Sequence, residues 1–208
     1  DLGWLGIGFH NFVSGIRVDG WAETNPPYLV VVSRAGAAIF HVDDDSPFDP
    51  GPGDPAVSDP DEDGSPAHPF DSIQEAIDAT AWEWIDNPDT VLVANGTYTG
   101  VGNRDITFGG KPVHVRSARG PESCIIDCQG SIVEPHRGFY FRGEGSATVV
   151  EGFTIRGGYA YSGGAIAVNH SSSPVIRGNV IFDNEAGNAG GGIYTNGGTI
   201  TGNSVHGN

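Results

Sequence analysis

The sequence predicts an all-β fold, a right-handed, single-stranded parallel β-helix (solenoid) with an α-helical cap at its N-terminal end. Three observations lead to this prediction. Short strand-like runs recur about every 25 residues in the second half of the chain, which suits one coil of a parallel β-helix and is too short for a propeller blade. Glycine accounts for 33 of the 208 residues and charged residues for only 17%, which excludes a helical bundle. Only one segment shows helical periodicity.

We divide the chain into three parts. Residues 1–35 are an N-terminal segment without an assigned fold, because frequent glycines interrupt its apolar residues. Residues 36–69 comprise a strand and then an acidic loop, in which Asp, Pro and Gly disfavour both helix and sheet. Residues 70–208 comprise the capping helix and the β-helix coils.

The capping helix is expected over residues 71–86. Ser72 and Glu75 form a capping box at its start, and apolar side chains follow at helical spacing. Pro88 ends the helix, and a strand is expected over residues 90–94. Because the open end of a β-helix would expose strand edges, this helix is well placed to cover the N-terminal end.

Two interleaved series of strand-like runs define the repeat. The first series comprises Ile126-Asp127, Val150-Glu151, Ile176-Arg177 and Ile200-Thr201. The second series comprises residues 113–116, 139–142, 164–166 and 191–193. Equivalent residues of stacked coils should form columns about 4.8 Å apart. Asparagines with the same spacing should form amide ladders, in which Asn179 pairs with Asn203 and Asn184 with Asn208. Since the repeat continues to the last residue, we expect further coils beyond the sequence.

The second series predicts a ligand site. Its inward column should comprise Val115, Phe141, Ile166 and Ile193. On the outward face, His114 should then lie over Tyr140, and Arg116 over Arg142. Two guanidinium groups beside an aromatic ring can grip the carboxylate or sulfate of a sugar. The alternative is a solvated face without a ligand.

The first series predicts an outward column that contains Asp127, Glu151 and Arg177. Two carboxylates one coil apart repel, so the pKa of one should rise unless a cation or Arg177 relieves it. Uronate lyases combine acids that hold calcium with an arginine near the sugar, which makes these three residues the candidate catalytic group. A structural ladder of ion pairs needs the same residues and is the favoured interpretation.

The acidic loop contains a candidate calcium motif. Asp59, Asp61 and Asp63 alternate before Gly64, and this pattern can wrap carboxylate oxygens around Ca²⁺ at a sharp turn. The motif is incomplete as an EF-hand because Phe70 stands where the final glutamate is needed. The alternative is a solvated acidic loop. We expect no other cofactor.

Charge and apolar runs exclude two classes of function. The formal net charge is −16, and no Lys or Arg occurs between Arg34 and Arg104. This acidic region would repel nucleic acid. No apolar run is long enough to span a membrane. The two cysteines, Cys124 and Cys128, would lie roughly 13 Å apart on one strand, too far for a disulfide, so we expect small buried thiols.

Several segments resemble known β-helix proteins. Residues 69–77 followed by 89–98 resemble the first segment of right-handed parallel β-helix proteins of the pectin-lyase-like superfamily, and residues 124–130 and 151–155 resemble its coils. Residues 163–166 with 181–184 are similar to repeats of polymorphic outer-membrane and autotransporter-type surface proteins. The resemblance covers about residues 65–208 and implies the fold. It leaves function open, because the superfamily includes lyases, hydrolases, esterases, epimerases and non-catalytic adhesins.

Two functional hypotheses follow. The first is a secreted or cell-surface bacterial scaffold or adhesin-like module that contacts acidic polysaccharide or neighbouring surface proteins. The second is a polysaccharide-active enzyme, either a calcium-assisted uronate lyase or a glycoside hydrolase. The motifs of polygalacturonases and pectin methylesterases do not occur in the sequence, so the first hypothesis is preferred.

Overall fold

The computed structural model describes residues 36–51, 53–82 and 87–208. Residues Ala38–Asn208 form one compact unit, and the fold below is that of this unit. The N-terminal segment 1–35 that the sequence left unassigned lies outside the described residues. The acidic loop belongs to the same unit as the coils that follow it.

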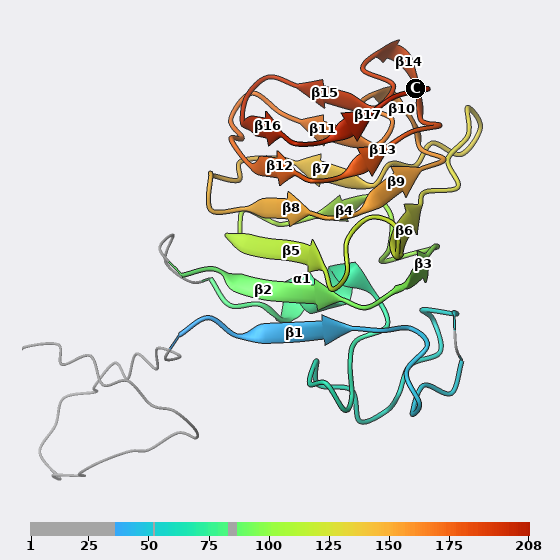
Figure 1. Ribbon diagram of the computed structural model, residues 1–208, viewed down its shortest axis with the longest axis vertical. Helices are drawn as coiled ribbons and strands as arrows, with labels where there is room; N and C mark the ends of the chain where they lie inside the picture. Colours follow the sequence, from blue (N-terminus) through green and yellow to red (C-terminus); the bar gives the residue numbers. More distant parts are fainter. Residues whose placement is uncertain (1–35, 52, 83–86) are drawn as a thin grey trace, which may run out of the picture. The chain divides into compact units, whose positions relative to one another are not determined.

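Three parallel sheets form the sides of a right-handed solenoid, which confirms the predicted β-helix (Figure 1). The first sheet has the order β1 (Ile39–Val42), β2 (Asp89–Val93), β5 (Val113–Ser117), β8 (Val149–Glu151), β12 (Val175–Arg177) and β16 (Thr199–Thr201). The second has β3 (Gly96–Tyr98), β6 (Cys124–Asp127), β9 (Thr154–Arg156), β13 (Val180–Ile181) and β17 (Ser204–Val205). The third has β4 (Ile106–Thr107), β7 (Phe139–Phe141), β11 (Ile166–Val168) and β15 (Ile193–Thr195).

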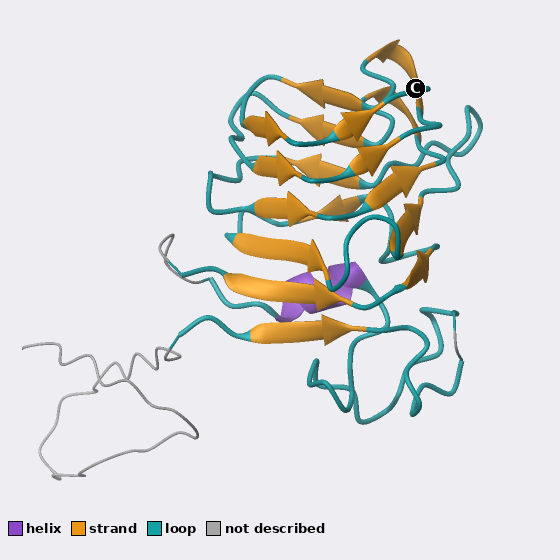
Figure 2. Ribbon diagram, viewed as in Figure 1, coloured by secondary structure: helices purple, strands orange, loops and turns teal. Residues whose placement is uncertain are grey.

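Each complete coil contributes one strand to each of the three sheets. An additional parallel pair, β10 (Tyr159–Ser162) and β14 (Glu185–Ala189), lies between the second and third sheets along the chain. Every strand pairing between neighbouring coils is parallel, so the backbone groups of one coil bond to those of the coils on either side (Figure 2). The solenoid is therefore held together by contacts between nearest-neighbour coils.

Stacked apolar side chains fill the interior. Valines and isoleucines of the first sheet, Val91, Val115, Val150 and Ile176, form one inward column, and all are fully or almost fully buried. In the third sheet, Ile106, Phe139 and Ile166 form a second buried column. The alternating burial of β2 and β5 has the two-residue period of a sheet with one face in the core.

The predicted columns were partly wrong. Val150 and Ile176 pair as expected, but Ile126 pairs with Ile155 in the second sheet. In the second series, Phe139 rather than Phe141 stacks on Ile166, while Val115 belongs to the first sheet. The cause is one long coil: in register, the step from β5 to β8 is nine residues longer than the step from β8 to β12. A constant period therefore misaligns the strands on either side of it.

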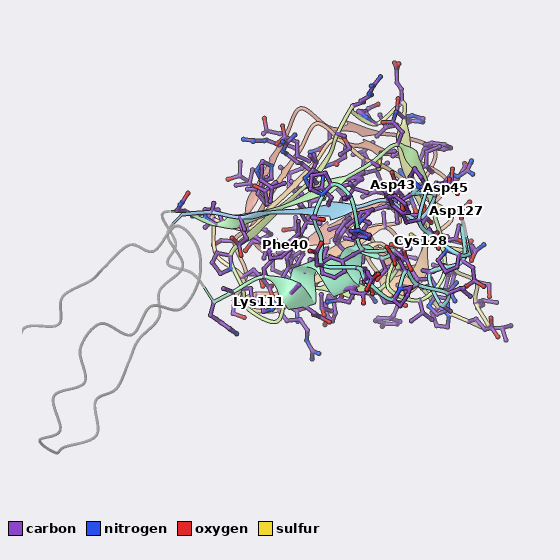
Figure 3. The ribbon with its side chains drawn as sticks, turned by 90° about the horizontal axis from the view of Figure 1, so that it is seen from below. Phe40, Asp43, Asp45, Lys111, Asp127 and Cys128 are labelled. Atoms are coloured by element: carbon purple, nitrogen blue, oxygen red, sulfur yellow. The ribbon has the colours of Figure 1, made fainter. Side chains whose placement is uncertain are left out.

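Within the described residues, one helix closes the N-terminal end, as predicted, but it is shorter than the sequence indicated. Helix α1 comprises Ile73–Ala79, and the Ser72 side chain accepts a hydrogen bond from Glu75 N at 3.3 Å. Thr80 is already extended. Lys111 Nζ satisfies the carbonyl groups at this end by donating to those of Ile77, Asp78 and Thr80 at 2.8–3.0 Å. Figure 3 shows Lys111 beside the helix. Residues 83–86 of the expected helix lie outside the described residues.

The end of the acidic loop protects the free edge of β1. His41 N donates to Gly64 O, Phe70 N donates to His41 O, and Asp43 N donates to Phe70 O, at 2.8–3.0 Å. These bonds satisfy the outer backbone groups of His41 and the outer N–H of Asp43, at the C-terminal end of the first strand. The loop therefore blocks edge-to-edge association at this end together with the helix, a role that the sequence pattern had assigned to the helix alone.

The predicted amide ladders are present. Asn179 Nδ2 donates to Asn203 Oδ1 at 3.0 Å, and Asn184 Nδ2 donates to Asn208 Oδ1 at 2.9 Å. Each asparagine also bonds backbone groups of the adjacent coil, as Asn179 Oδ1 does by accepting from Phe153 N. The ladders satisfy buried backbone groups at the corners of the solenoid, where no strand partner exists.

Candidate functional site

The structure separates the four predicted ligand residues into two groups. His114 and Arg116 lie on β5 in the first sheet, whereas Tyr140 lies on β7 in the third sheet and Arg142 directly follows it. The expected stacking of His114 over Tyr140 and of Arg116 over Arg142 is therefore wrong, because the two segments occupy different sides of the solenoid.

Alternating charges form a column on the first sheet. Arg116 pairs in register with Glu151, and Glu151 with Arg177. Glu151 Oε2 lies 2.7 Å from Arg177 Nη2 and 2.8 Å from His114 Nε2. The hydrogen bond from Arg177 lowers the pKa of the Glu151 carboxyl, with a smaller contribution from His114. Burial lowers the pKa of His114 against the opposing effect of Glu151. This arrangement is that of the structural ion-pair ladder.

Asp127 does not belong to that column. It lies on β6 in the second sheet, in register with Arg156, and its carboxylate pairs with the Arg156 guanidinium at 3.1 Å. The expected repulsion between Asp127 and Glu151 is therefore absent, and the position beside Glu151 is taken by Arg116. The structure brings together only Glu151 and Arg177 of the three candidate catalytic residues.

A cluster on the third sheet combines an aromatic ring with two cations. We call Arg137, Tyr140, Arg142 and Asn169 the tyrosine–arginine cluster. The guanidinium carbons of Arg137 and Arg142 lie 4.9 and 5.1 Å from the centre of the Tyr140 ring, within the range of cation–π contacts. The Tyr140 hydroxyl accepts a hydrogen bond from Asn169 Nδ2 at 3.1 Å. The ring is thus held by two cation–π contacts and by the hydrogen bond at its hydroxyl group.

Backbone and core contacts hold the cluster in place. Phe139 and Phe141 point into the core, so Tyr140 between them points outward. Arg137 Nη1 donates to Ser162 O at 3.0 Å, and burial lowers the pKa of its guanidinium. Glu144, which is almost completely buried, accepts from the backbone N of Arg142 and from Gly110 N. These bonds orient the turn that carries Arg142.

Neither guanidinium group of this cluster forms an ion pair with a carboxylate in the described part of the chain, and the nearby Asp105 accepts from the backbone N of Arg137 at 3.0 Å. Described arginine–carboxylate pairs join Arg156 to Asp127 and Arg177 to Glu151. Arg142 is exposed, so its guanidinium edge is open to a ligand. Two members, Arg137 and Asn169, were missed by sequence reasoning. Arg137 lies just before the strand, and Asn169 comes from the next coil, so a strand-based repeat alignment contains no signal for either.

The three aspartates of the calcium motif make other contacts. Asp59 Oδ2 lies 2.6 Å from His68 Nδ1, which lowers the pKa of Asp59 and raises that of His68. Asp59 Oδ1 accepts from Asp61 N, and Asp63 Oδ1 accepts from Ser65 N. Across the described ranges, no three His, Cys, Asp or Glu side chains stand in metal-ligating positions. Calcium binding by Asp59, Asp61 and Asp63 stays a prediction.

Cys124 and Cys128 are free and buried, as the sequence predicts for core thiols.

A hollow of about 430 Å³ is lined by residues that include Tyr159, Asp183 and Glu185. None of the predicted site residues lines this hollow. None of the helices in the described residues is long and apolar enough to cross a membrane.

Comparison of the chain with protein-family models, curated proteins and solved structures finds no match. The chain is therefore assigned to a fold, the parallel β-solenoid, by its own strand order and register. The superfamily suggested by the sequence resemblance stays a prediction.

Proposed function

We propose that this β-solenoid scaffold is a binding module that takes an acidic polysaccharide at the tyrosine–arginine cluster. The observation that carries the proposal is the pair of guanidinium groups on the Tyr140 ring, neither of which forms an ion pair with a carboxylate among the described residues. Guanidinium groups bind carboxylate and sulfate through paired hydrogen bonds, and the aromatic ring keeps both cations in one place.

The charge distribution supports a ligand on the coils and not at the N-terminal end. Residues 43–89 contain fifteen acidic residues and no Lys or Arg, whereas residues 104–208 contain eight acidic and eight basic residues. A polyanion is repelled by the first region and meets a balanced surface on the second. An extracellular or cell-surface location belongs to the proposal because carboxylated and sulfated polysaccharides occur there.

A binding role agrees better with the geometry than the alternative of a uronate lyase. Glu151 is held by Arg177 and His114, and its lowered pKa opposes proton uptake at neutral pH. Asp127 lies on another sheet. The catalytic combination expected from the sequence is thus not assembled in one place.

The test is affinity for polygalacturonate, with neutral dextran as the comparison polymer, measured by isothermal titration calorimetry at low and moderate salt. We expect binding of polygalacturonate that weakens with added salt, and a loss of about ten-fold in affinity for Arg142→Ala. Arg119→Ala is the matched control because Arg119 is an exposed arginine outside the cluster. Equal losses in the two variants, or binding of dextran as tight as that of polygalacturonate, would contradict the proposal.

A further inference from the structure

Two tyrosines occupy one outward column of the third sheet. In register, Tyr140 of β7 pairs with Ala167 of β11, and Ala167 pairs with Tyr194 of β15. The three strands belong to successive coils (Figure 1). Since neighbouring strands lie about 4.8 Å apart, the backbones of the two tyrosines are separated by about 10 Å along the solenoid axis. Both tyrosines are half-buried, so each ring keeps an exposed part.

A second column lies beside the first and carries hydrogen-bonding groups. The bonds from Asn169 N to Phe141 O, at 3.1 Å, and from Asn196 N to Val168 O, at 3.3 Å, continue the register beyond the strands. Arg142, Asn169 and Asn196 therefore occupy equivalent positions of three successive coils. A cation is followed by two amides, each of which can donate and accept hydrogen bonds.

The cationic end of this surface already spans two coils. Arg137 Nη1 donates to Ser162 O at 3.0 Å, and Ser162 belongs to β10, which precedes β11 in the same coil. The guanidinium group that contacts the Tyr140 ring therefore extends from the coil of β7 to the coil of β11. Positive charge thus lies along the solenoid axis as well as beside Tyr140.

The strands of the third sheet present no negative charge. The strands β4, β7, β11 and β15 contain no Asp or Glu. Of the acids beside them, Glu144 is buried and accepts from backbone groups. Asp105 is bonded to His136 and to the backbone N of Arg137. The surface of the three coils is therefore complementary to an anionic chain along the axis.

The spacing of the two tyrosines favours one shape of polysaccharide. One coil advances by about 4.8 Å, close to the length of a pyranose residue in an extended chain, so a chain along the axis places one sugar on each coil. In a chain with equatorial linkages, successive rings are turned over, and every second ring presents the same face. Aromatic rings pack against such apolar faces. Two tyrosines two coils apart therefore meet the same face of alternate sugars, whereas a buckled chain with axial linkages does not follow a straight column.

We propose that the tyrosine–arginine cluster is one end of a longer site that continues to Tyr194 and Asn196, and that the ligand is an extended uronate polysaccharide with equatorial linkages, aligned with the solenoid axis. This inference rests on the proposed function and refines the shape and direction of its ligand. The two arginines of the cluster bind the carboxylate of the sugar on Tyr140. Tyr194 receives the apolar face of the sugar two positions further along the chain.

The test is a nuclear magnetic resonance titration of the full chain with tetramers of mannuronate and of guluronate. The two tetramers carry the same charge on every sugar, but mannuronate has equatorial and guluronate axial linkages. We expect the mannuronate tetramer to bind at least about five-fold more tightly and to shift the amide signals of Tyr194 and Asn196. The mannuronate dimer is too short to reach from Tyr140 to Tyr194 and should leave these two signals in place.

Variants of Tyr194 test the role of its ring. Tyr194→Ala should weaken binding of the mannuronate tetramer by about three- to ten-fold and leave binding of the dimer unchanged. Tyr194→Phe keeps the ring and should bind the tetramer within about two-fold of the native affinity. Tyr161→Ala is the matched control, because Tyr161 is 76% exposed on β10 and lies outside the column. It should bind both oligomers with native affinity.

The outcomes separate this inference from the proposed function. If the guluronate tetramer binds as tightly as the mannuronate tetramer, or if Tyr194→Ala binds the mannuronate tetramer no more weakly than Tyr161→Ala does, the extended site is refuted. Binding that Arg142→Ala weakens would in that case still support the cluster as the ligand site. If neither tetramer binds at all, both the proposed function and the extended site are wrong.

Discussion

The amide ladder makes a quantitative prediction about stability. Asn179 is completely buried, and its side chain accepts from Phe153 N at 2.9 Å and donates to Val150 O at 3.2 Å and Asn203 Oδ1 at 3.0 Å. Asn179→Ala removes all three bonds. The buried Phe153 N–H then lacks its acceptor, which costs about 1–3 kcal/mol, and the other two bonds contribute roughly 1 kcal/mol each.

We therefore expect Asn179→Ala to lower the free energy of unfolding by about 3–5 kcal/mol, measured by urea denaturation followed by circular dichroism. For a unit of this size, the melting temperature should fall by about 6–20 °C. Asn188→Ala is the control, because Asn188 is exposed and makes one long hydrogen bond of 3.4 Å to Ser162 Oγ. It should cost less than about 0.5 kcal/mol.

A second variant separates shape from hydrogen bonding. Asn179→Asp keeps an acceptor for Phe153 N but loses both donated bonds, and it places a carboxylate beside Asn203 Oδ1. It should destabilise the fold at least as much as the alanine variant at neutral pH. A loss below about 1 kcal/mol for both variants of Asn179 would refute the conclusion that the ladder supports the corners of the solenoid.

Three further predictions concern titrating groups. Burial, followed by the charge of Asp45, raises the pKa of Asp44 to about 7. Between about pH 4 and 7, the folded state therefore holds a proton that the unfolded chain releases. The free energy of unfolding should fall as the pH rises through this range. Asp44→Asn should make this fall shallower and raise the free energy of unfolding by about 2–4 kcal/mol at pH 8. Equal pH dependence of thermal unfolding in the variant and the native sequence would contradict this prediction. Burial raises the pKa of the Cys124 and Cys128 thiols to about 12. A thiol reagent should therefore label neither cysteine in native buffer and both in urea. Rapid labelling of the native protein would show that the assignment of these thiols to the core is wrong. Glu151→Gln should cost less than about 1 kcal/mol, because the ion pair with Arg177 is partly exposed; a loss above about 2 kcal/mol in urea denaturation would mean that the charge column supports the fold.

The architecture and its corner ladders could be predicted from the sequence because they depend on recurrence along the chain. A period of about 25 residues with strand-like runs leaves few folds other than a β-helix. Asparagines at the same interval must then meet in neighbouring coils, as Asn179 and Asn203 do. The start of the helix was also readable, since the bond between Ser72 and Glu75 is local.

The composition of the candidate site was not predictable in the same way. One coil is longer than its neighbours, so a constant period placed Asp127 beside Glu151 when Arg116 occupies that position. The contact between Arg137 and Tyr140 was missed because Arg137 lies outside the repeated strand.

Only the tertiary structure decided which side chains meet where the coils are irregular. Helix α1 ends at Ala79, and Lys111, more than thirty positions away, bonds the carbonyl groups of its last turn. The acidic loop likewise bonds His41 of β1 through Gly64 and Phe70, in a loop fold that no periodicity describes. The physical reason is that a repeat determines strand positions through nearest-neighbour hydrogen bonds, whereas contacts made by loops depend on how one irregular segment packs against the regular coils.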